Sequence, residues 1–277
     1  MKPTTETPAS GERRLAVGRV EVTVSDEIGR IVFANPTKRN ALSKQMMLDA
    51  ASVLDRFKED SRIGAVIVSG ANGTFAAGAD LGEAAASRAE NRDARPVTLD
   101  AAAGRLFNSL DAFDRPILAM IRGYCLGAGV AIALRADIRI ATPDSIFGIP
   151  AARVGIGYPL PEVEALVAAV GPAAASDLLF TARRIDGVEA HRIGLATRLA
   201  TEEDLDGAVT EVARTISGNA PLSVRAAKAA IASVTGRDRP DALERAHRLL
   251  DLCANSYDAH EGALAFMERR PPAFRGQ

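Results

Sequence analysis

The sequence predicts an α/β fold followed by a helical carboxyl-terminal region, and three observations support this. Short apolar segments of strand length alternate with helix-period patterns in the first half of the chain. From Pro159 onward almost every segment has helical periodicity. No low-complexity linker separates the two halves. We therefore expect layers of strands and helices with an appended helical region, not two independent folds.

The first predicted elements are a β-hairpin and an amphipathic helix. Residues 19–25 and 30–34 carry alternating β-branched side chains on either side of residues 26–29, a pattern typical of a hairpin. Ser43 is expected to cap the helix, because apolar residues recur after it with the spacing i, i+3, i+4, i+7. These apolar residues are Met47, Ala50, Ala51, Leu54 and Phe57.

A repeated order of strand, turn and helix follows. The apolar run Ala65–Val68 predicts a strand buried on both faces, and the small-residue turn Phe75–Leu81 comes after it. A second such turn is Gly123–Gly129. The polar, alanine-rich segment 82–98 is expected to be a helix or loop that could line a substrate channel. The other predicted elements here are helices over 99–113 and 128–135 and strands near 117–122, 137–141 and 145–147.

The second half of the chain is predicted to consist of helices. Their expected positions are 161–170, 172–181, 187–193, 202–217, 221–234, 239–254 and 257–269.

Composition and charge exclude several classes of protein. A chain of 277 residues with 47% hydrophobic residues can bury a large core. Its net charge of −1 favours neither nucleic acid nor a membrane surface as a partner. Cys125 and Cys253 are too few for a disulfide scaffold or a cysteine-based metal site, and no signal-like or membrane-spanning run is evident, so we expect a cytoplasmic protein. Residues 1–14 are expected to form a disordered tail.

The two small-residue turns can present backbone N–H groups to a ligand. A helix that begins near Gly127-Ala128-Gly129 leaves its first N–H groups unpaired and carries a partial positive charge at that end. With an opposing N–H from Ala77, these groups would form an oxyanion hole. The alternative is that the glycines only allow a helix and a strand to pack closely.

Other chemistries fit the sequence less well. After Gly127 and Gly129, the third small residue of a dinucleotide fingerprint would fall at Ile132, so that spacing fails. No phosphate-binding loop and no nucleophile-elbow motif occur. His260-Glu261 lacks the second histidine of a zinc helix, so no metal site is expected.

Five segments occur in this order along the chain: Ala34–Leu42, Phe75–Leu81, Arg122–Gly129, Ala136–Ala141 and Glu261–Phe274. They resemble the enoyl-CoA hydratase/isomerase (crotonase) superfamily, and the resemblance covers about residues 19–277. The resemblance implies a spiral of ββα repeats over 15–200, with a helical region over 201–277 that mediates trimerisation, often as stacked trimers in a hexamer. It also implies a coenzyme A thioester as ligand, no prosthetic group, and a place in fatty acid metabolism.

The resemblance also assigns roles to individual residues. The thioester oxygen would be bound by the N–H groups of Ala77 and Ala128. A second group of residues would contact coenzyme A along its length. A third group would contact the nucleotide of a coenzyme A bound in a neighbouring subunit. The alternative for the charged ones is solvated surface, and Asp80 could equally be a helix N-cap. The residues expected along coenzyme A are Lys38, Ala41, Ala79 and Asp80, and those from the neighbouring subunit are Phe266 and Arg269.

The chain departs from the family pattern at both acid–base positions. Hydratases of this family use two glutamates, and alignment without gaps places alanines there, Ala131 and Ala151. An alanine cannot transfer a proton, and a positioned acid or base contributes roughly 10² to 10⁴ in rate. The usual hydratase mechanism is therefore in doubt.

Three nearby residues are candidate replacements. Glu162 or Glu164 could direct a carboxylate toward the site, although a solvated helix N-terminus is the alternative. Tyr158 has a spacing similar to that of a tyrosine in methylmalonyl-CoA decarboxylase relatives, but Ala79 stands where those relatives have histidine. Arg153 could pair with a substrate carboxylate if it faced the pocket.

Three functions therefore remain open. The first is an acyl-CoA-directed enzyme of the hydratase/isomerase kind, a lyase or isomerase, whose oxyanion hole stabilises a thioester enolate. The others are a non-catalytic acyl-CoA-binding protein and an acyl-CoA decarboxylase that uses Tyr158.

Overall fold

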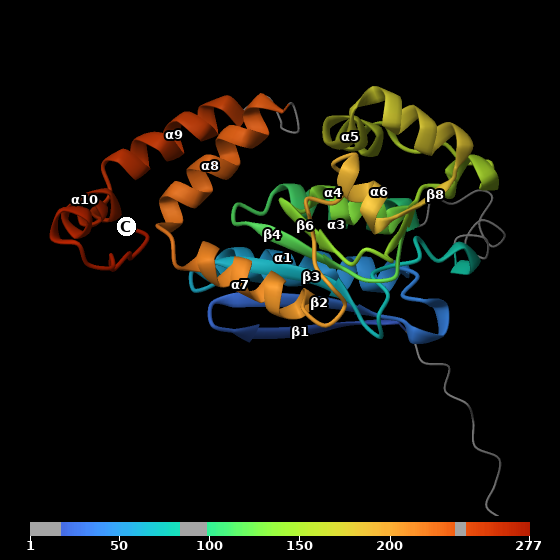
Figure 1. The fold of residues 1–277 in the computed structure, drawn as a ribbon, viewed down its shortest axis with the longest axis horizontal. Helices are drawn as coiled ribbons and strands as arrows, with labels where there is room; N and C mark the ends of the chain where they lie inside the picture. The colour runs from blue at the N-terminus through green and yellow to red at the C-terminus, as the bar shows by residue number, and fades with distance from the viewer. Residues whose placement is uncertain (1–17, 84–98, 236–241) are drawn as a thin grey trace, which may run out of the picture.

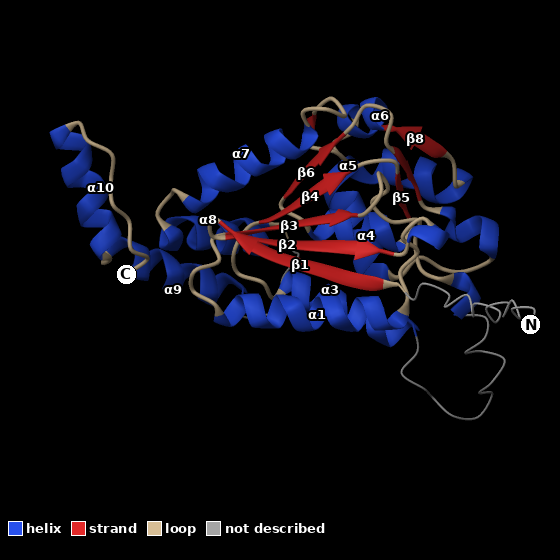
Figure 2. Ribbon diagram, turned by 90° about the horizontal axis from the view of Figure 1, so that it is seen from below, coloured by secondary structure: helices blue, strands red, loops and turns tan. Residues whose placement is uncertain are grey.

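The computed structural model describes residues 18–83, 99–235 and 242–277, and it contains two sheets. The larger has the strand order β1-β2-β3-β4-β6-β9, and most of its strands lie side by side in Figure 2. The smaller has the order β5-β7-β8. Apart from the antiparallel pairs β1–β2 and β7–β8, neighbouring strands are parallel. The α/β prediction is confirmed, whereas the predicted helix or loop over 82–98 falls almost wholly outside the described residues.

The hairpin and the first helix form as predicted. Strands β1 (Arg19–Ser25) and β2 (Ile28–Ala34) are joined at Asp26 and Glu27, both with positive φ, as a two-residue hairpin turn requires. Helix α1 (Lys44–Glu59) is capped by Ser43, whose hydroxyl accepts from the Met46 N–H at 3.2 Å.

The central strands are buried on both faces because helices cover both. On β3 (Ala65–Gly70), Val66 and Val68 belong to the core cluster that includes α1 and α3 (Leu99–Asp111), whereas Ala65 and Ile67 belong to the cluster with α7 (Leu205–Ser217). This explains the continuous apolar run of β3. The remaining strands of this sheet are β4 (Ile117–Ile121), β6 (Ile138–Ala141) and β9 (Arg198–Leu199).

The smaller sheet consists of three short strands. They are β5 (Tyr124–Leu126), β7 (Ile146–Gly148) and β8 (Arg184–Asp186). The expectation of an almost wholly helical chain after Pro159 is wrong at β8 and β9. Strands of three and two residues are too short to show an alternating pattern, so their pairing depends on neighbours distant in sequence.

Helix α5 (Leu160–Thr181) is bent where the sequence predicts two separate helices. Gly171 has the non-helical angles φ 76° and ψ 164°, and Pro172 follows it. Among the described helices, α5 is the one long and apolar enough to cross a membrane by length and composition. The bend divides it into two parts, each shorter than the roughly 20 residues that a crossing needs.

The last three helices extend away from the sheets, as Figure 1 shows, and we call them the C-terminal arm. They are α8 (Pro221–Val234), α9 (Ala242–Ala254) and α10 (Tyr257–Glu268). Helices α8 and α9 pack through small side chains such as Ala226 and Ala229, while Val234 is 82% exposed. Helix α7 lies on the sheet, so the projecting part of the chain begins with α8.

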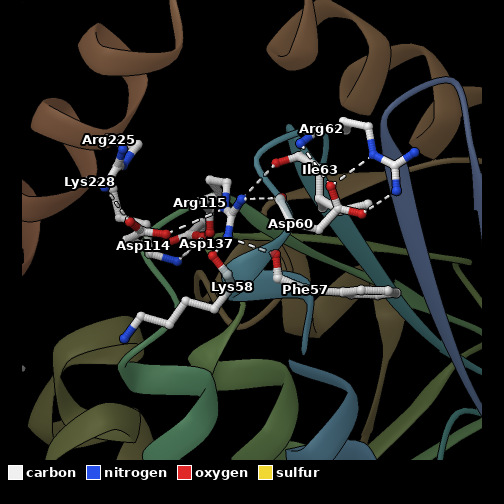
Figure 3. A network of polar contacts seen from close by, with 10 residues as sticks. All are labelled: Phe57, Lys58, Asp60, Arg62, Ile63, Asp114, Arg115, Asp137, Arg225 and Lys228. Atoms are coloured by element: carbon white, nitrogen blue, oxygen red, sulfur yellow. Dashed lines mark hydrogen bonds and ion pairs between the residues drawn. The ribbon is translucent and has the colours of Figure 1, made fainter. Parts of the chain in front are cut away.

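Arg115 joins the core to the base of the arm (Figure 3). Its guanidinium donates to the carbonyls of Phe57, Lys58 and Asp60 at 2.7–2.8 Å, at the end of α1. Its own carbonyl accepts from Lys228 on α8 at 2.9 Å. The same lysine pairs with Asp137 at 2.9 Å. The unpaired carbonyls of a helix end are thus satisfied by a nearly buried cation that is also tied to the arm.

The two small-residue turns are held together by backbone pairing. The Ala76 N–H donates to the Tyr124 carbonyl at 2.8 Å, and the Leu126 N–H donates to the Ala76 carbonyl at 2.9 Å. Helix α4 (Ala128–Arg135) begins directly after β5. A Cβ on Gly129 would lie 2.8 Å from the Ala76 carbonyl oxygen, so only glycine allows this approach.

Arg115→Ala should destabilise the fold by about 2–3 kcal/mol, because it leaves several carbonyls at the end of α1 without their donor. Denaturant unfolding monitored by circular dichroism measures the effect. Arg56→Ala, at an exposed position on α1, is the control and should barely move the unfolding midpoint. Equal midpoints for the two variants would contradict the capping role of Arg115.

Gly129→Ala should cost about 1–3 kcal/mol, because the added methyl group overlaps backbone that cannot rotate away. The matched control is Gly207→Ala on α7, where a Cβ would meet no atom within 4 Å. The control should leave the stability unchanged or raise it slightly. Thermal unfolding of both variants provides the comparison, and a wild-type melting temperature for Gly129→Ala would show that the two turns can separate.

Candidate active site

A cavity of about 200 Å³ lies where the two small-residue turns meet α3, α4 and the start of α5. Its walls are mostly apolar, and Asp100, Tyr158 and Glu162 are the titratable residues among those that line it. The structure therefore brings most of the predicted site residues into one space. Those that line the cavity are Ala77, Ala79, Ala128, Ala131, Ala151, Tyr158 and Glu162.

The two predicted oxyanion-hole amides are in different states. Ala128 is the first residue of α4, and no described residue accepts a hydrogen bond from its N–H. The Ala77 N–H donates to the Arg39 carbonyl at 3.1 Å. Both residues line the cavity. An incoming oxygen would find the Ala128 donor open, and it would have to share or displace the Arg39 carbonyl at Ala77.

Ala131 and Ala151 both line the cavity. They are 1% and 9% exposed, respectively. Ala131 lies on α4 one turn after Ala128, and Ala151 lies in the 3-10 helix Pro150–Val154. Both side chains are therefore part of the cavity wall, and neither can transfer a proton.

The Tyr158 hydroxyl donates to the Gly127 carbonyl at 3.3 Å, next to the start of α4. Burial raises the pKa of this phenol well above its usual value, and the negative charge of Glu162 raises it further. The hydroxyl therefore stays protonated at neutral pH and cannot act as a base there.

Glu162 is buried, contrary to the alternative of a solvated helix N-terminus. It is 5% exposed, and its Oε1 lies 3.1 Å from Nη2 of Arg135. Its Oε2 is also buried and has no hydrogen-bond partner among the described residues. A buried carboxylate oxygen without a donor is uncommon in proteins and requires an explanation.

Arg135, at the end of α4, is a residue that the sequence analysis did not single out. Its guanidinium donates to the Ala131 carbonyl at 3.1 Å and to Asp111 at 3.2 Å, and it lies 4.1 Å from the centre of the Phe107 ring. The one sequence feature that could have placed Arg135 near the site is its position four residues after Ala131. That spacing is common in helices and does not single out a residue.

Glu164 and Arg153 do not line the cavity, and both are exposed. The charged residues predicted along coenzyme A form a pair outside the cavity, with Lys38 Nζ 2.6 Å from Asp80 Oδ2. Asp80 also accepts from the N–H groups of Gly82 and Glu83, so it caps the helical segment that begins at Leu81. Burial alone would raise the pKa of Asp80, but Lys38 and the backbone donors outweigh it and lower the pKa. Ala41 is half-buried nearby.

Phe266 and Arg269 lie at the far end of the molecule from the cavity of the same chain, because α10 is distant from α4 in both views (Figures 1 and 2). Phe266 is 86% exposed. Within one chain they cannot reach a ligand in the cavity. Within residues 18–83, 99–235 and 242–277, no group of three His, Cys, Asp or Glu side chains is arranged to hold a metal ion.

Comparison with known proteins gives consistent results. A family model described as "Enoyl-CoA hydratase/isomerase" matches residues 23–277. The Mycobacterium tuberculosis protein named "Probable enoyl-CoA hydratase echA8" is 33% identical over 247 residues, which cover 89% of this chain and 94% of that protein. The 2,3-dehydroadipyl-CoA hydratase of Escherichia coli is 30% identical over 249 residues, with 89% and 94% of the two chains covered.

Solved structures agree with the sequence matches. The crystal structure of an enoyl-CoA hydratase/carnithine racemase from Magnetospirillum magneticum superposes with a TM-score of 0.83 at 29% identity, covering 95% of this chain and 97% of that one. The chain belongs to the enoyl-CoA hydratase/isomerase family and has the crotonase fold.

Proposed function

We propose that the protein is an enzyme that binds an acyl-CoA thioester in the cavity and stabilises its enolate between the N–H groups of Ala77 and Ala128. The observation that carries the proposal is that both residues line one apolar cavity, with the Ala128 N–H open at the start of a helix. Related proteins named as hydratases of CoA thioesters support the substrate class.

An enolate oxygen carries more negative charge than the thioester oxygen it comes from. The amide at the start of α4 and the partial positive charge of that helix end stabilise the enolate more than the ground state, which is the requirement for catalysis. The Ala77 N–H can donate to the enolate oxygen when its hydrogen bond to the Arg39 carbonyl is broken or shared. No prosthetic group is needed for this step.

Water addition by the usual pair of glutamates is not the reaction we favour. Ala131 and Ala151 face the cavity and offer no acid or base. The titratable groups at the cavity are Tyr158, Glu162 and Asp100. We therefore favour proton transfer at the carbon next to the thioester, the chemistry of an isomerase, over hydration.

The remaining ligand contacts are also proposals. Lys38 and Asp80, with Ala41 and Ala79, would lie along coenzyme A. In a homotrimer or hexamer, Phe266 and Arg269 of the arm would reach the coenzyme A bound by a neighbouring copy. The exposed side chains of Phe266 (86%) and Met267 (73%) on α10 support burial of the arm in such an assembly. We propose a cytoplasmic location.

Two other functions use the same site. A decarboxylase would generate the enolate by loss of CO₂, and the protonated hydroxyl of Tyr158 at the cavity wall could orient the substrate carboxylate. An acyl-CoA-binding protein without turnover would need the oxyanion hole alone, in line with the alanines at 131 and 151.

Incubation of the protein in D₂O with saturated, α,β-unsaturated and malonyl-type acyl-CoAs should place deuterium at the α-carbon of at least one of them. Mass analysis of the recovered thioesters measures the label. The expected result follows because an enolate held in the hole picks up a solvent-derived proton when it collapses.

The other outcomes separate the alternatives. Loss of CO₂ without a requirement for α-proton removal would favour the decarboxylase, and addition of water would establish a hydratase. Saturable binding with no chemistry across the panel would favour the binding protein. No acyl-CoA binding at all would refute the proposed ligand.

Ala128→Pro should lower the labelling rate by about 10² to 10³, because it removes one oxyanion-hole donor. Proline is tolerated at the first position of a helix, where its missing N–H has no partner inside the helix. Ala128→Val is the matched control, since it adds the same number of side-chain carbons and keeps the N–H. Equal rates for the two variants would contradict the role of the Ala128 amide.

A further inference from the structure

A buried carboxylate outside the usual acid–base positions of the site has one oxygen without a partner. We propose that Glu162 is the catalytic base of the cavity, and that its Oε2 removes and returns the α-proton of the bound thioester. The inference rests on the proposed function, because it assigns a residue to the enolate step.

The two carboxylate oxygens of Glu162 have different surroundings. Oε1 is paired with Arg135 at 3.1 Å, and both side chains are 6% exposed. Oε2 is buried and has no partner among the described residues, yet Glu162 lines the cavity. Burying a carboxylate oxygen without a hydrogen-bond donor costs free energy. The ion pair with Arg135 therefore explains the position of Oε1 but gives no reason for burying Oε2. A bound C–H acid would be the natural partner of Oε2.

Arg135 fixes the position of the Glu162 carboxylate. Arg135 lies one turn after Ala131 on α4, and its guanidinium donates back to the Ala131 carbonyl at 3.1 Å. The same guanidinium binds Glu162, which stands near the start of α5. The pair therefore brings a carboxylate from α5 to the part of α4 that carries Ala131. Ala131, Ala151 and Glu162 line the same cavity.

The other titratable residues at the cavity are less suited to act as a base. The Tyr158 hydroxyl is protonated and donates to the Gly127 carbonyl. Asp100 is exposed at the start of α3, where water solvates its carboxylate. Among the described residues that line the cavity, Glu162 is the buried carboxylate.

The proposed step balances without any other reactant. Oε2 of the Glu162 carboxylate takes the proton from the α-carbon, and the C–H electron pair forms the carbon–carbon double bond of the enolate. The carbonyl π pair moves to the oxygen, which the amides of Ala77 and Ala128 hold. Glu162 is then a neutral acid that exchanges its proton with solvent or returns it to the α-carbon.

The test compares Glu162→Gln with Glu164→Gln in the D₂O labelling assay. Both substitutions lie near the start of α5, but Glu164 is exposed and does not line the cavity. Glu162→Gln should lower α-carbon labelling by about 10² to 10⁴, the usual contribution of a general base. Glu164→Gln should retain the wild-type rate. Binding of a saturated acyl-CoA and the melting temperature are measured in parallel for both variants. Neither weaker binding nor a lower melting temperature should account for the lower labelling rate of Glu162→Gln.

Each outcome is decisive. Labelling by Glu162→Gln within a few-fold of wild type would overturn the role of Glu162 and leave the proposed function standing. Absence of α-carbon labelling in the wild type with every acyl-CoA would refute the proposed function. It would also refute the role of Glu162, because there would be no α-proton removal to catalyse. Should Glu162→Gln fail to fold, Glu162→Asp keeps the charge and withdraws the carboxylate by one methylene. A wild-type rate in Glu162→Asp would overturn the proposal, and a loss of at least about tenfold with intact binding would support it.

Discussion

The backbone pairing between the two small-residue turns is the constraint on which the cavity depends. Ala76 bonds to Tyr124 and Leu126 through its own N–H and carbonyl, so the loop after β3 and the short strand β5 behave as one unit. Helix α4 starts directly behind β5, and Gly129 lets it approach Ala76 to a distance that any side chain would prevent. Main-chain hydrogen bonds therefore set the relative position of the Ala77 and Ala128 amides, which are far apart in sequence. Substitutions of side chains that line the cavity would leave these hydrogen bonds largely intact.

Because main-chain hydrogen bonds hold the two turns together, the cavity keeps its shape with alanines at positions 131 and 151 of its wall. The methyl side chains of Ala131 and Ala151 line the cavity and make no hydrogen bonds, while the ion pair of Arg135 and Glu162 joins α4 to α5. Burying such a pair costs desolvation free energy that its mutual attraction only partly returns. Asp111, the Ala131 carbonyl and the Phe107 ring surround the guanidinium and offset part of that cost.

Much of the fold could be predicted from local pattern, and the ion pair could not. The continuous apolar run of β3, the Ser43 cap and the bounds of α4 and α8 follow from the sequence. Strands β5, β8 and β9 were missed because two or three residues show no periodicity. Ala131, Ala151 and Tyr158 were placed by motif spacing and do line the cavity. The burial of Glu162 depends on Arg135, which is 27 residues away, and no local pattern reports such a contact.

Cys125 acquires a chemical meaning from its position on β5, opposite Ala76. The thiol is fully buried, and burial raises its pKa far above the usual value. A thiol reacts with a thioester as the thiolate, which burial suppresses here. An acyl group bound next to this strand would therefore not migrate from coenzyme A to the protein. Under the proposed function, the protein can therefore keep a buried cysteine in β5 without acylating itself.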